Sequence, residues 1–263
     1  MIIGNKAFEG GTHVMAIINL TPDSFWQGSR RTLSDVLAAA EKAVEDGAEV
    51  LDIGAQSTRP GYTEVSAEEE ISRFLQPLKL IKKHVPVPVS IDTYFAESAR
   101  AALGEGADMI NDIWGLTHDE KMAATIASYG ASVCIMHNSK TQLSGDIWAP
   151  IKEFLSNSVN IAISAGISPE RICLDGGIGF AKSREDNLKL LEGYGRLSEL
   201  GYPLLLGASR KSLFGGRVEE RLAPTLAATK KAVRDGVMFV RVHDVKENVL
   251  AIKEALADGQ GHN

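Results

Sequence analysis

Residues able to do chemistry stand at the ends of eight short apolar segments of this 263-residue chain. At these ends lie Asn19, Asp52, Asp92, Asn111 with Asp112, Met136 with His137, Asp175, Ser209 with Arg210 and Lys211, and Arg241 with His243. A carboxylate that closes an apolar strand is expensive to bury unless it is paired or serves a ligand. We therefore interpret Asp92 and Asp175 as functional. Asp52 and Asp112 could equally cap helices or turns, Asn19 could be a turn residue, and His137 could be a satisfied core histidine.

The charges at these ends fall into two groups. Cations follow the second segment, at Arg59, and the last two segments, at Arg210, Lys211, Arg241 and His243. Arginine and lysine bind phosphate oxygens through charge-assisted hydrogen bonds. Between the cations stand Asp92, Asn111 and Asp175, whose acceptors suit a flat heterocycle with several N–H donors. The residue types alone therefore predict an anionic group bound beside a polar planar ring.

The elements that must position these residues follow an alternating pattern. The apolar segments are continuous rather than alternating, as expected of strands buried on both faces. They cover residues 13–19, 49–54, 87–92, 108–113, 132–137, 172–176, 203–208 and 238–243. Amphipathic stretches lie between them, with examples at 66–84, 94–107, 151–166, 183–200 and 245–257. Eight such alternations predict an α/β fold of the (β/α)8 (TIM) barrel type, with an open doubly wound sheet as the alternative. In such a barrel the active site forms at the C-terminal ends of the strands.

Composition bounds the class of protein. Residues 1–263 show no break that would mark a second domain, so we expect a single domain with residues 1–12 as an N-terminal cap and 258–263 as a flexible tail. The net charge of −6 argues against a nucleic-acid partner, and the apolar segments are shorter than the roughly 20 residues of a membrane span. Cys134 and Cys173 lie inside apolar segments and are expected to be buried reduced thiols, which makes the cytoplasm the default location.

Seven sequence blocks resemble those of the dihydropteroate synthase family of pterin-binding enzymes. They read "MAIINLTPDSF", "DIGAQSTRPGYTEVSAEEEISR", "VSIDTYFAESARAALGEGADMINDIWGL", "IMHN", "LDGGIGFAKSREDN", "LLLGASRKS" and "FVRVHDVKE". The blocks occur in the family's order and cover most of the chain. The family fold is a (β/α)8 barrel, in agreement with the strand count reached from the residues.

The resemblance implies a reaction, a cofactor and a set of roles. The family joins 4-aminobenzoate to 6-hydroxymethyl-7,8-dihydropterin diphosphate and releases pyrophosphate, with Mg²⁺ on the diphosphate. The implied pterin residues are Asp92, Asn111, Met136, Asp175 and Lys211. The implied diphosphate residues are Asn19, which would also help to hold Mg²⁺, Arg59, Arg241 and His243. The implied aminobenzoate residues are Phe25, Thr58, Pro60, Phe180 and Ser209. Catalysis would fall to Asp92, Asp175, Lys211, Arg241 and His243.

The family also implies two loops that close over the substrate, a homodimer and competition between sulfonamides and 4-aminobenzoate. The closing loop explains why residues 19–31, with Phe25 and Trp26, are longer than an ordinary strand-to-helix connection of about 2–6 residues. The chain departs from the family at Gly176, where proline is usual, and at Trp26-Gln27, where Ser-Asp is common. The segment after Met136 also differs, which leaves His137 and Asn138 without an assigned role.

Two other functions compete with this interpretation. The first is a pterin-binding methyltransferase that uses methyltetrahydrofolate and a corrinoid partner. Such enzymes share the barrel and the pterin-binding Asp and Asn, but look unlike this chain because they lack the combination of "TPDSF" with "SRKS" and "RVHD". The second is a non-catalytic pterin-binding homologue, against which the intact Asn19, Arg59, Lys211, Arg241 and His243 argue.

Overall fold

The structure is a computed structural model that describes residues 1–20, 33–56, 65–143 and 145–260. Eight parallel strands form its central sheet, in the order β8-β7-β6-β5-β4-β3-β10-β9. Their bounds are β3 His13–Asn19, β4 Val50–Gly54, β5 Val89–Asp92, β6 Met109–Asp112, β7 Ser132–Met136, β8 Ile172–Asp175, β9 Leu205–Leu206 and β10 Phe239–Val242. Within the described residues a single bridge, between Leu174 and Leu204, joins the two ends of this order, so the barrel closes at a weak seam between β8 and β9.

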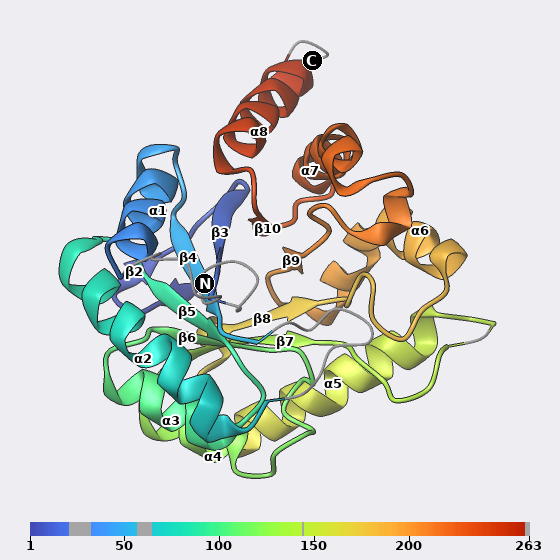
Figure 1. Cartoon of the computed structure of the whole chain (residues 1–263). Coiled ribbons are helices and arrows are strands. Elements are labelled where there is room, and N and C mark those ends of the chain that lie inside the picture. The colour runs from blue at the N-terminus through green and yellow to red at the C-terminus, as the bar shows by residue number, and fades with distance from the viewer. Residues whose placement is uncertain (21–32, 57–64, 144, 261–263) are drawn as a thin grey trace.

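Helices surround the strands on the outside (Figure 1). They are α1 Leu33–Glu45, α2 Ala67–His84, α3 Ala96–Gly104, α4 Met122–Ser128, α5 Trp148–Ser164, α6 Arg184–Glu192, α7 Leu222–Arg234 and α8 Val245–Gln260. Short 3-10 turns are η2 Pro169–Arg171, η3 Tyr194–Leu200, η4 Ser212–Phe214 and η5 Val218–Arg221. Helix α2 is capped at its N-terminus, because the Ser66 side chain accepts a hydrogen bond from the Glu69 amide. None of the helices in the described ranges is both long and apolar enough to cross a membrane.

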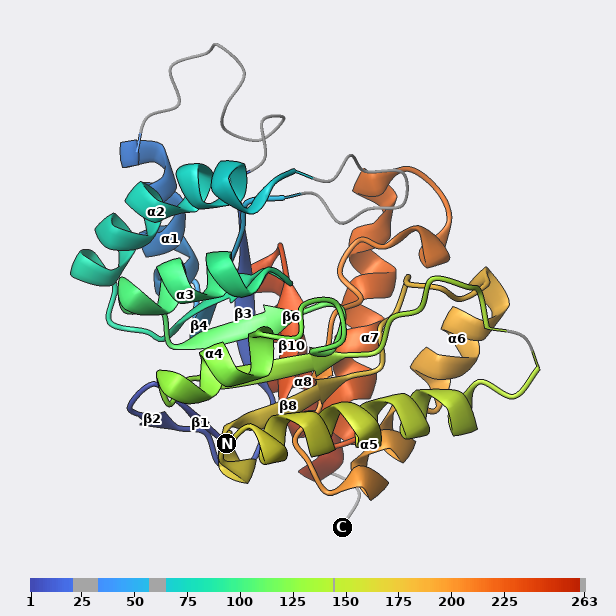
Figure 2. The same ribbon diagram turned by 90° about the horizontal axis from the view of Figure 1, so that it is seen from below.

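A two-stranded hairpin, β1 Ile2–Ile3 and β2 Lys6–Ala7, precedes the barrel. Its Ile3 and the following Phe8 are almost fully buried. They form one apolar cluster with side chains of the barrel strands, among them Met15 and Phe239. Phe8 meets Phe239 edge to face at a centroid distance of 5.2 Å. Figure 2 places this hairpin near the ends at which β3 and β10 begin. The N-terminal end of the barrel is therefore filled with apolar side chains, and the opposite end is left for chemistry.

The predicted barrel is confirmed, and each of the eight predicted strand segments contains a strand. The predicted helix 183–200 is wrong in one respect, because it divides at Gly193 into α6 and η3. A side chain there could not be accommodated, since a Cβ on Gly193 would lie 2.7 Å from the Trp148 ring. The predicted tail also begins too early. Helix α8 runs to Gln260, so Gly259 lies within the helix and does not end it.

Candidate active site

Strand register brings several predicted residues to one level at the C-terminal end of the barrel. Asn19 pairs with Gly54, Gly54 with Asp92, and Asp92 with Asn111 across four neighbouring strands. Gly54 keeps the row open, because a Cβ there would lie 3.7 Å from Asn19 Oδ1 and 3.9 Å from Asp92 Cβ. Asn19, Asp92 and Asn111 therefore converge, although more than ninety residues separate the first from the last.

Arg241 of β10 links two buried carboxylates at the centre of this end. Its Nε donates to Asp52 Oδ2 at 2.5 Å and its Nη2 donates to Asp92 Oδ2 at 2.7 Å. Asn111 Nδ2 also donates to Asp52 Oδ2, at 3.3 Å. The second oxygen of each carboxylate, Oδ1, is buried and has no hydrogen-bond partner among the described residues. Buried acceptors without partners are destabilising, so these two oxygens are suited to N–H donors of a ligand.

Burial dominates the protonation of Asp92. It raises the pKa of this carboxyl to about 7, against the opposing effect of the Arg241 guanidinium. Asp52 is fully buried. Among the described residues, its Oδ2 accepts hydrogen bonds only from Arg241 and Asn111. A single guanidinium therefore balances two carboxylates, and the centre keeps excess negative charge when both are ionised.

Lys211 lies across the barrel end, in the loop after β9. Its ammonium donates to the Ile178 carbonyl and lies 4.6 Å from the centroid of the Phe180 ring. Its Cδ would be 3.1 Å from a Cβ on Gly179, so the chain of methylenes packs over that glycine. Burial lowers the pKa of Lys211 to about 8, although Asp175 favours its charged form. The structure thus gives this lysine a proton that can be lost near neutral pH.

An apolar wall completes this end of the barrel. Met136 is buried with Tyr94 and Ile113, and Phe95, Trp114 and Phe180 pack against this group. The register pairs Met136 with Asp175, so the wall stands directly beside a carboxylate. Aromatic and sulfur-containing side chains of this kind pack well against the face of a flat ligand ring. The carboxylates can accept hydrogen bonds from N–H groups on the edge of the same ring.

Ser209 and His243 meet at the rim. His243 Nδ1 and Ser209 Oγ are 2.9 Å apart, and the His243 amide donates to the same oxygen at 3.2 Å. The neighbouring Arg210 does not join them. Its Nε and Nη2 bind the two oxygens of Asp244, at 2.7 and 2.6 Å, so the sequence-based grouping of Arg210 with the phosphate cations is wrong. Arg210, which has a φ of 54°, and the adjacent Lys211 therefore have different partners, Asp244 and the Ile178 carbonyl.

The two undecided aspartates separate clearly. Asp112 accepts hydrogen bonds from the amides of Trp114 and Leu116, at 2.8 and 2.9 Å, and so stabilises a turn. Asp52 instead belongs to the Arg241 centre.

Sequence reasoning missed Lys182 and Tyr194. Lys182 donates to the carbonyls of Gly177 and Phe180, each at 3.0 Å, and its Nζ lies 2.9 Å from His137 Nδ1. Burial lowers the pKa of Lys182 to about 7 and that of His137 to about 3. His137 is therefore a buried neutral partner of this loop. The position of Lys182 in the "FAKS" segment was visible in the sequence, but nothing there shows that its side chain turns back onto the loop.

Five residues singled out from the sequence, Phe25, Trp26, Thr58, Arg59 and Pro60, lie outside the described residues. Four of them carry predicted roles, which stay predictions. In the described ranges no cluster of three or more His, Cys, Asp or Glu side chains could hold a metal ion. Asn19 does offer an amide oxygen beside Asp92, and Mg²⁺ commonly takes only one or two protein oxygens together with substrate phosphates and water. The donor set therefore fits a metal that arrives on a diphosphate.

Comparison with known proteins agrees with this geometry. Residues 15–243 match the family model described as "Pterin binding enzyme". A dihydropteroate synthase of Clostridium beijerinckii is 45% identical over 261 residues, which cover 96% of this chain and 97% of the relative. The crystal structure of dihydropteroate synthase from Clostridium difficile in the presence of pteroic acid superposes with a TM-score of 0.93 at 42% identity, covering 96% and 98% of the two chains. The enzyme of Xanthomonas albilineans with 4-aminobenzoic acid gives a TM-score of 0.90 at 37% identity, over 95% and 93%. The chain therefore belongs to the pterin-binding enzyme family and, within it, to the dihydropteroate synthases.

Proposed function

We propose that the chain joins 6-hydroxymethyl-7,8-dihydropterin diphosphate to 4-aminobenzoate, giving 7,8-dihydropteroate and pyrophosphate in folate biosynthesis. The observation that carries the proposal is the pair of buried Oδ1 atoms on Asp52 and Asp92, which have no hydrogen-bond partner among the described residues, at the same barrel end as Asn111 and the apolar wall that contains Met136. A pterin edge presents several N–H donors in one plane, which these acceptors match. The enzyme is thus a transferase of a pterinylmethyl group.

The pterin would lie with its edge on Asp92 and Asn111 and its face on Met136. Asp175 and Lys211 would bind the remaining ring atoms. When the bond from the methylene carbon to the diphosphate oxygen breaks, negative charge grows on the leaving group and positive charge on the pterin. Asp175 stabilises the second charge, and Arg241 and His243 stabilise the first, together with Arg59 in the prediction from sequence. Preorganised charges of this kind supply much of an enzyme's rate enhancement.

Mg²⁺, when bound, would neutralise diphosphate charge as a Lewis acid. Asn19 would hold it from the protein side, and His243 with Ser209 would hold diphosphate oxygens at the rim. The arylamine then attacks the methylene carbon with its nitrogen lone pair, and the nitrogen loses a proton to solvent. Phe180 and Ser209, with Phe25, Thr58 and Pro60 as predicted from sequence, would hold the aminobenzoate. Water must be kept from the methylene carbon, because it would capture the same cation.

The test is release of pyrophosphate by the purified chain supplied with Mg²⁺, the dihydropterin diphosphate and 4-aminobenzoate. Release and formation of dihydropteroate are both expected, and a sulfonamide should compete with 4-aminobenzoate. The absence of product above background with intact pterin binding would favour a non-catalytic homologue. Methyl transfer from methyltetrahydrofolate to a corrinoid protein would favour the methyltransferase alternative, against which the family relationship and Lys211 argue.

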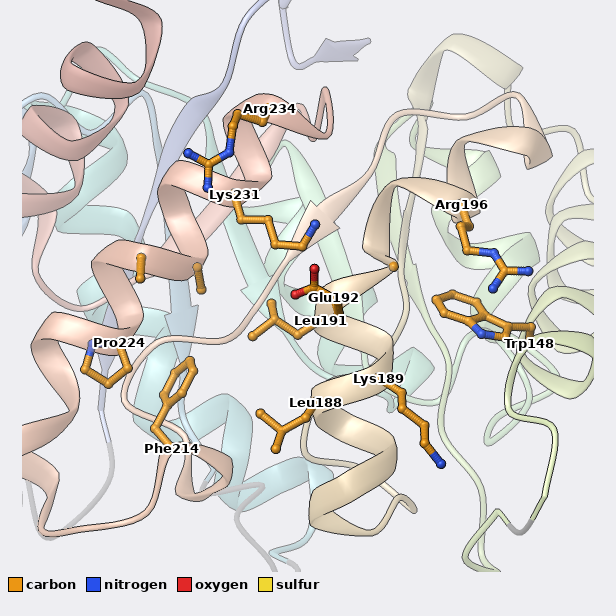
Figure 3. Close-up of a pocket in the computed structure, with 13 residues that line it drawn as sticks. Trp148, Leu188, Lys189, Leu191, Glu192, Arg196, Phe214, Pro224, Lys231 and Arg234 are labelled. Atoms are coloured by element: carbon orange, nitrogen blue, oxygen red, sulfur yellow. The ribbon is translucent and has the colours of Figure 1, made fainter. Parts of the chain in front are cut away.

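The chain is further proposed to form a homodimer through the outer surface of α6 and α7. A groove of about 840 Å³ lies there, with Leu188 and Leu191 of α6 opposite Phe214 and Pro224 (Figure 3). Leu188 is 39% exposed, and the groove is flanked by Lys231 and Glu192. A patch that carries apolar residues and both signs of charge suits an isologous contact with its own copy. The proposal agrees with the resemblance, and a cytoplasmic location likewise stays a prediction.

Ala227, an exposed residue of α7 that lines the groove, provides the test. Replacement by arginine adds a cation beside Lys231 and Arg234 and should convert a dimer into a monomer in sedimentation velocity. The matched control is Ala38→Arg on α1, which is also exposed but outside the groove and should leave the mass unchanged. A wild-type chain that sediments as a monomer at micromolar concentration would contradict the proposal.

A further inference from the structure

We propose that Tyr194 is a positioning residue for Asp175, and that its hydroxyl fixes this carboxylate across the weak seam of the barrel. The inference rests on the proposed function, in which Asp175 faces the pterin. Tyr194 begins η3, outside the strands, and is 1% exposed in the core between strands and helices. Its hydroxyl reaches the junction of β8 and β9, where the sheet pairing among the described residues is the Leu174–Leu204 bridge alone.

Three groups from two strands meet at this hydroxyl. Tyr194 OH donates towards Asp175 Oδ1 at 2.9 Å and towards the Leu205 carbonyl at 2.5 Å, so its one hydrogen serves both acceptors. The amide of Gly176 donates to the hydroxyl oxygen at 2.9 Å. Asp175 ends β8, Gly176 follows it directly, and Leu205 begins β9. The tyrosine therefore replaces hydrogen bonds that the short β9 does not make with β8.

The lack of a side chain at Gly176 leaves room for the Tyr194 ring. A Cβ at this position would lie 3.2 Å from Tyr194 Cε2 and 2.9 Å from Leu197 Cδ1, so the two side chains occupy the space. A proline at this position would have no N–H and could not donate to the hydroxyl. The Gly176 amide and the inward tyrosine therefore form one hydrogen-bonded unit.

The contacts orient the carboxylate. Oδ1 accepts from the Gly177 amide at 2.7 Å as well as from Tyr194. Oδ2 is turned towards Gly207, where a Cβ would approach it to 3.3 Å. Two hydrogen bonds on one oxygen hold the plane of the carboxyl group, and the other oxygen is left for the ligand. Burial raises the pKa of Tyr194 well above its ordinary value, so the hydroxyl keeps its proton at working pH.

Tyr194→Phe removes this one oxygen and keeps the ring. The KM for dihydropterin diphosphate and the Kd for 6-hydroxymethylpterin should rise about tenfold, as expected for one hydrogen bond to a charged group. The KM for 4-aminobenzoate should not change. Tyr202→Phe, in the same connection and half-buried, is the matched control and should leave both KM values unchanged. An unchanged pterin Kd in Tyr194→Phe, whatever its melting temperature, would overturn the proposal.

A double-mutant cycle separates positioning from simple packing at the seam. In an Asp175→Asn background, Tyr194→Phe should add little further loss of pterin affinity, because both changes act on one contact. Fully additive losses would contradict the proposal. Gly176→Ala is a second variant that displaces the tyrosine ring and should also weaken pterin binding, should Tyr194→Phe not fold. A wild-type chain that binds pterin but makes no product would instead overturn the proposed function alone.

Discussion

Replacing Arg241 with methionine is expected to lower kcat/KM by about a thousandfold or more, since the change removes a preorganised charge from the centre of the site. It should also destabilise the fold by about 3–5 kcal/mol, the range found when one partner of a buried ion pair is removed. The physical reason is Asp52, which has no exposed surface and whose Oδ2 lies 2.5 Å from Arg241 Nε. Both effects are measurable, as pyrophosphate release and as the midpoint of urea unfolding.

Arg217→Met is the control for this change. The Arg217 side chain is 80% exposed and pairs with Glu220 on the surface, where ion pairs contribute about 0–1 kcal/mol. A loss of stability no larger in Arg241→Met than in Arg217→Met would show that the two carboxylates do not depend on the guanidinium. The double variant Arg241→Met with Asp52→Asn should recover part of the stability, because it removes an unpaired buried charge, but not the activity.

The fold was readable from the sequence because its strands are buried on both faces. Continuous apolar segments such as 132–137 and polar residues at their ends follow directly from a closed parallel barrel. The register that brings Asp92 and Asn111 together is a consequence of the same regular pairing. Residues that lie on strand ends could therefore be placed without knowledge of any contact.

Residues whose role depends on a turn of the backbone or on a partner across the seam could not be placed in this way. Arg210 and Lys211 are adjacent cations in the sequence, yet Arg210 binds Asp244 and Lys211 binds the Ile178 carbonyl. The sequence placed Asp52 and Asp112 alike at strand ends, but Asp52 lies in the middle of β4 and meets a guanidinium, whereas Asp112 ends β6 and accepts from two amides. In the sequence Tyr194 falls on the apolar face of a predicted helix. Its hydroxyl binds Asp175 at a seam that exists because β9 is short, and the sequence does not show that seam.

Lys211→Met is expected to reduce kcat/KM by about a hundredfold, with most of the loss in pterin affinity, because it removes a charge-assisted bond that contributes roughly 1.5–3 kcal/mol. Methionine is one atom shorter than lysine but keeps the part of the side chain that packs over Gly179. Lys253→Met, an exposed position on α8, is the matched control and should be silent. A pterin Kd that is unchanged in Lys211→Met would refute the assignment of this lysine to the ring.

The pH dependence gives a sharper test of the same lysine. Burial places the pKa of Lys211 at about 8, so its ammonium is lost as the pH rises through that value. Burial also raises the pKa of Asp92 to about 7, so its carboxylate is lost as the pH falls through that value. Pterin affinity should therefore be greatest between these two values and decline on both sides.

Lys211→Met should keep the decline on the acid side and lose the decline on the alkaline side. Lys182 is the group that could imitate this result, since burial lowers its pKa to about 7 and it faces His137, Asp175 and Lys211. Lys182→Met should weaken the loop that carries Phe180 but retain the alkaline decline. The opposite result is that the alkaline decline of pterin affinity disappears in Lys182→Met and survives in Lys211→Met. The titrating group would then be Lys182, and the assignment of the alkaline decline to Lys211 would be wrong.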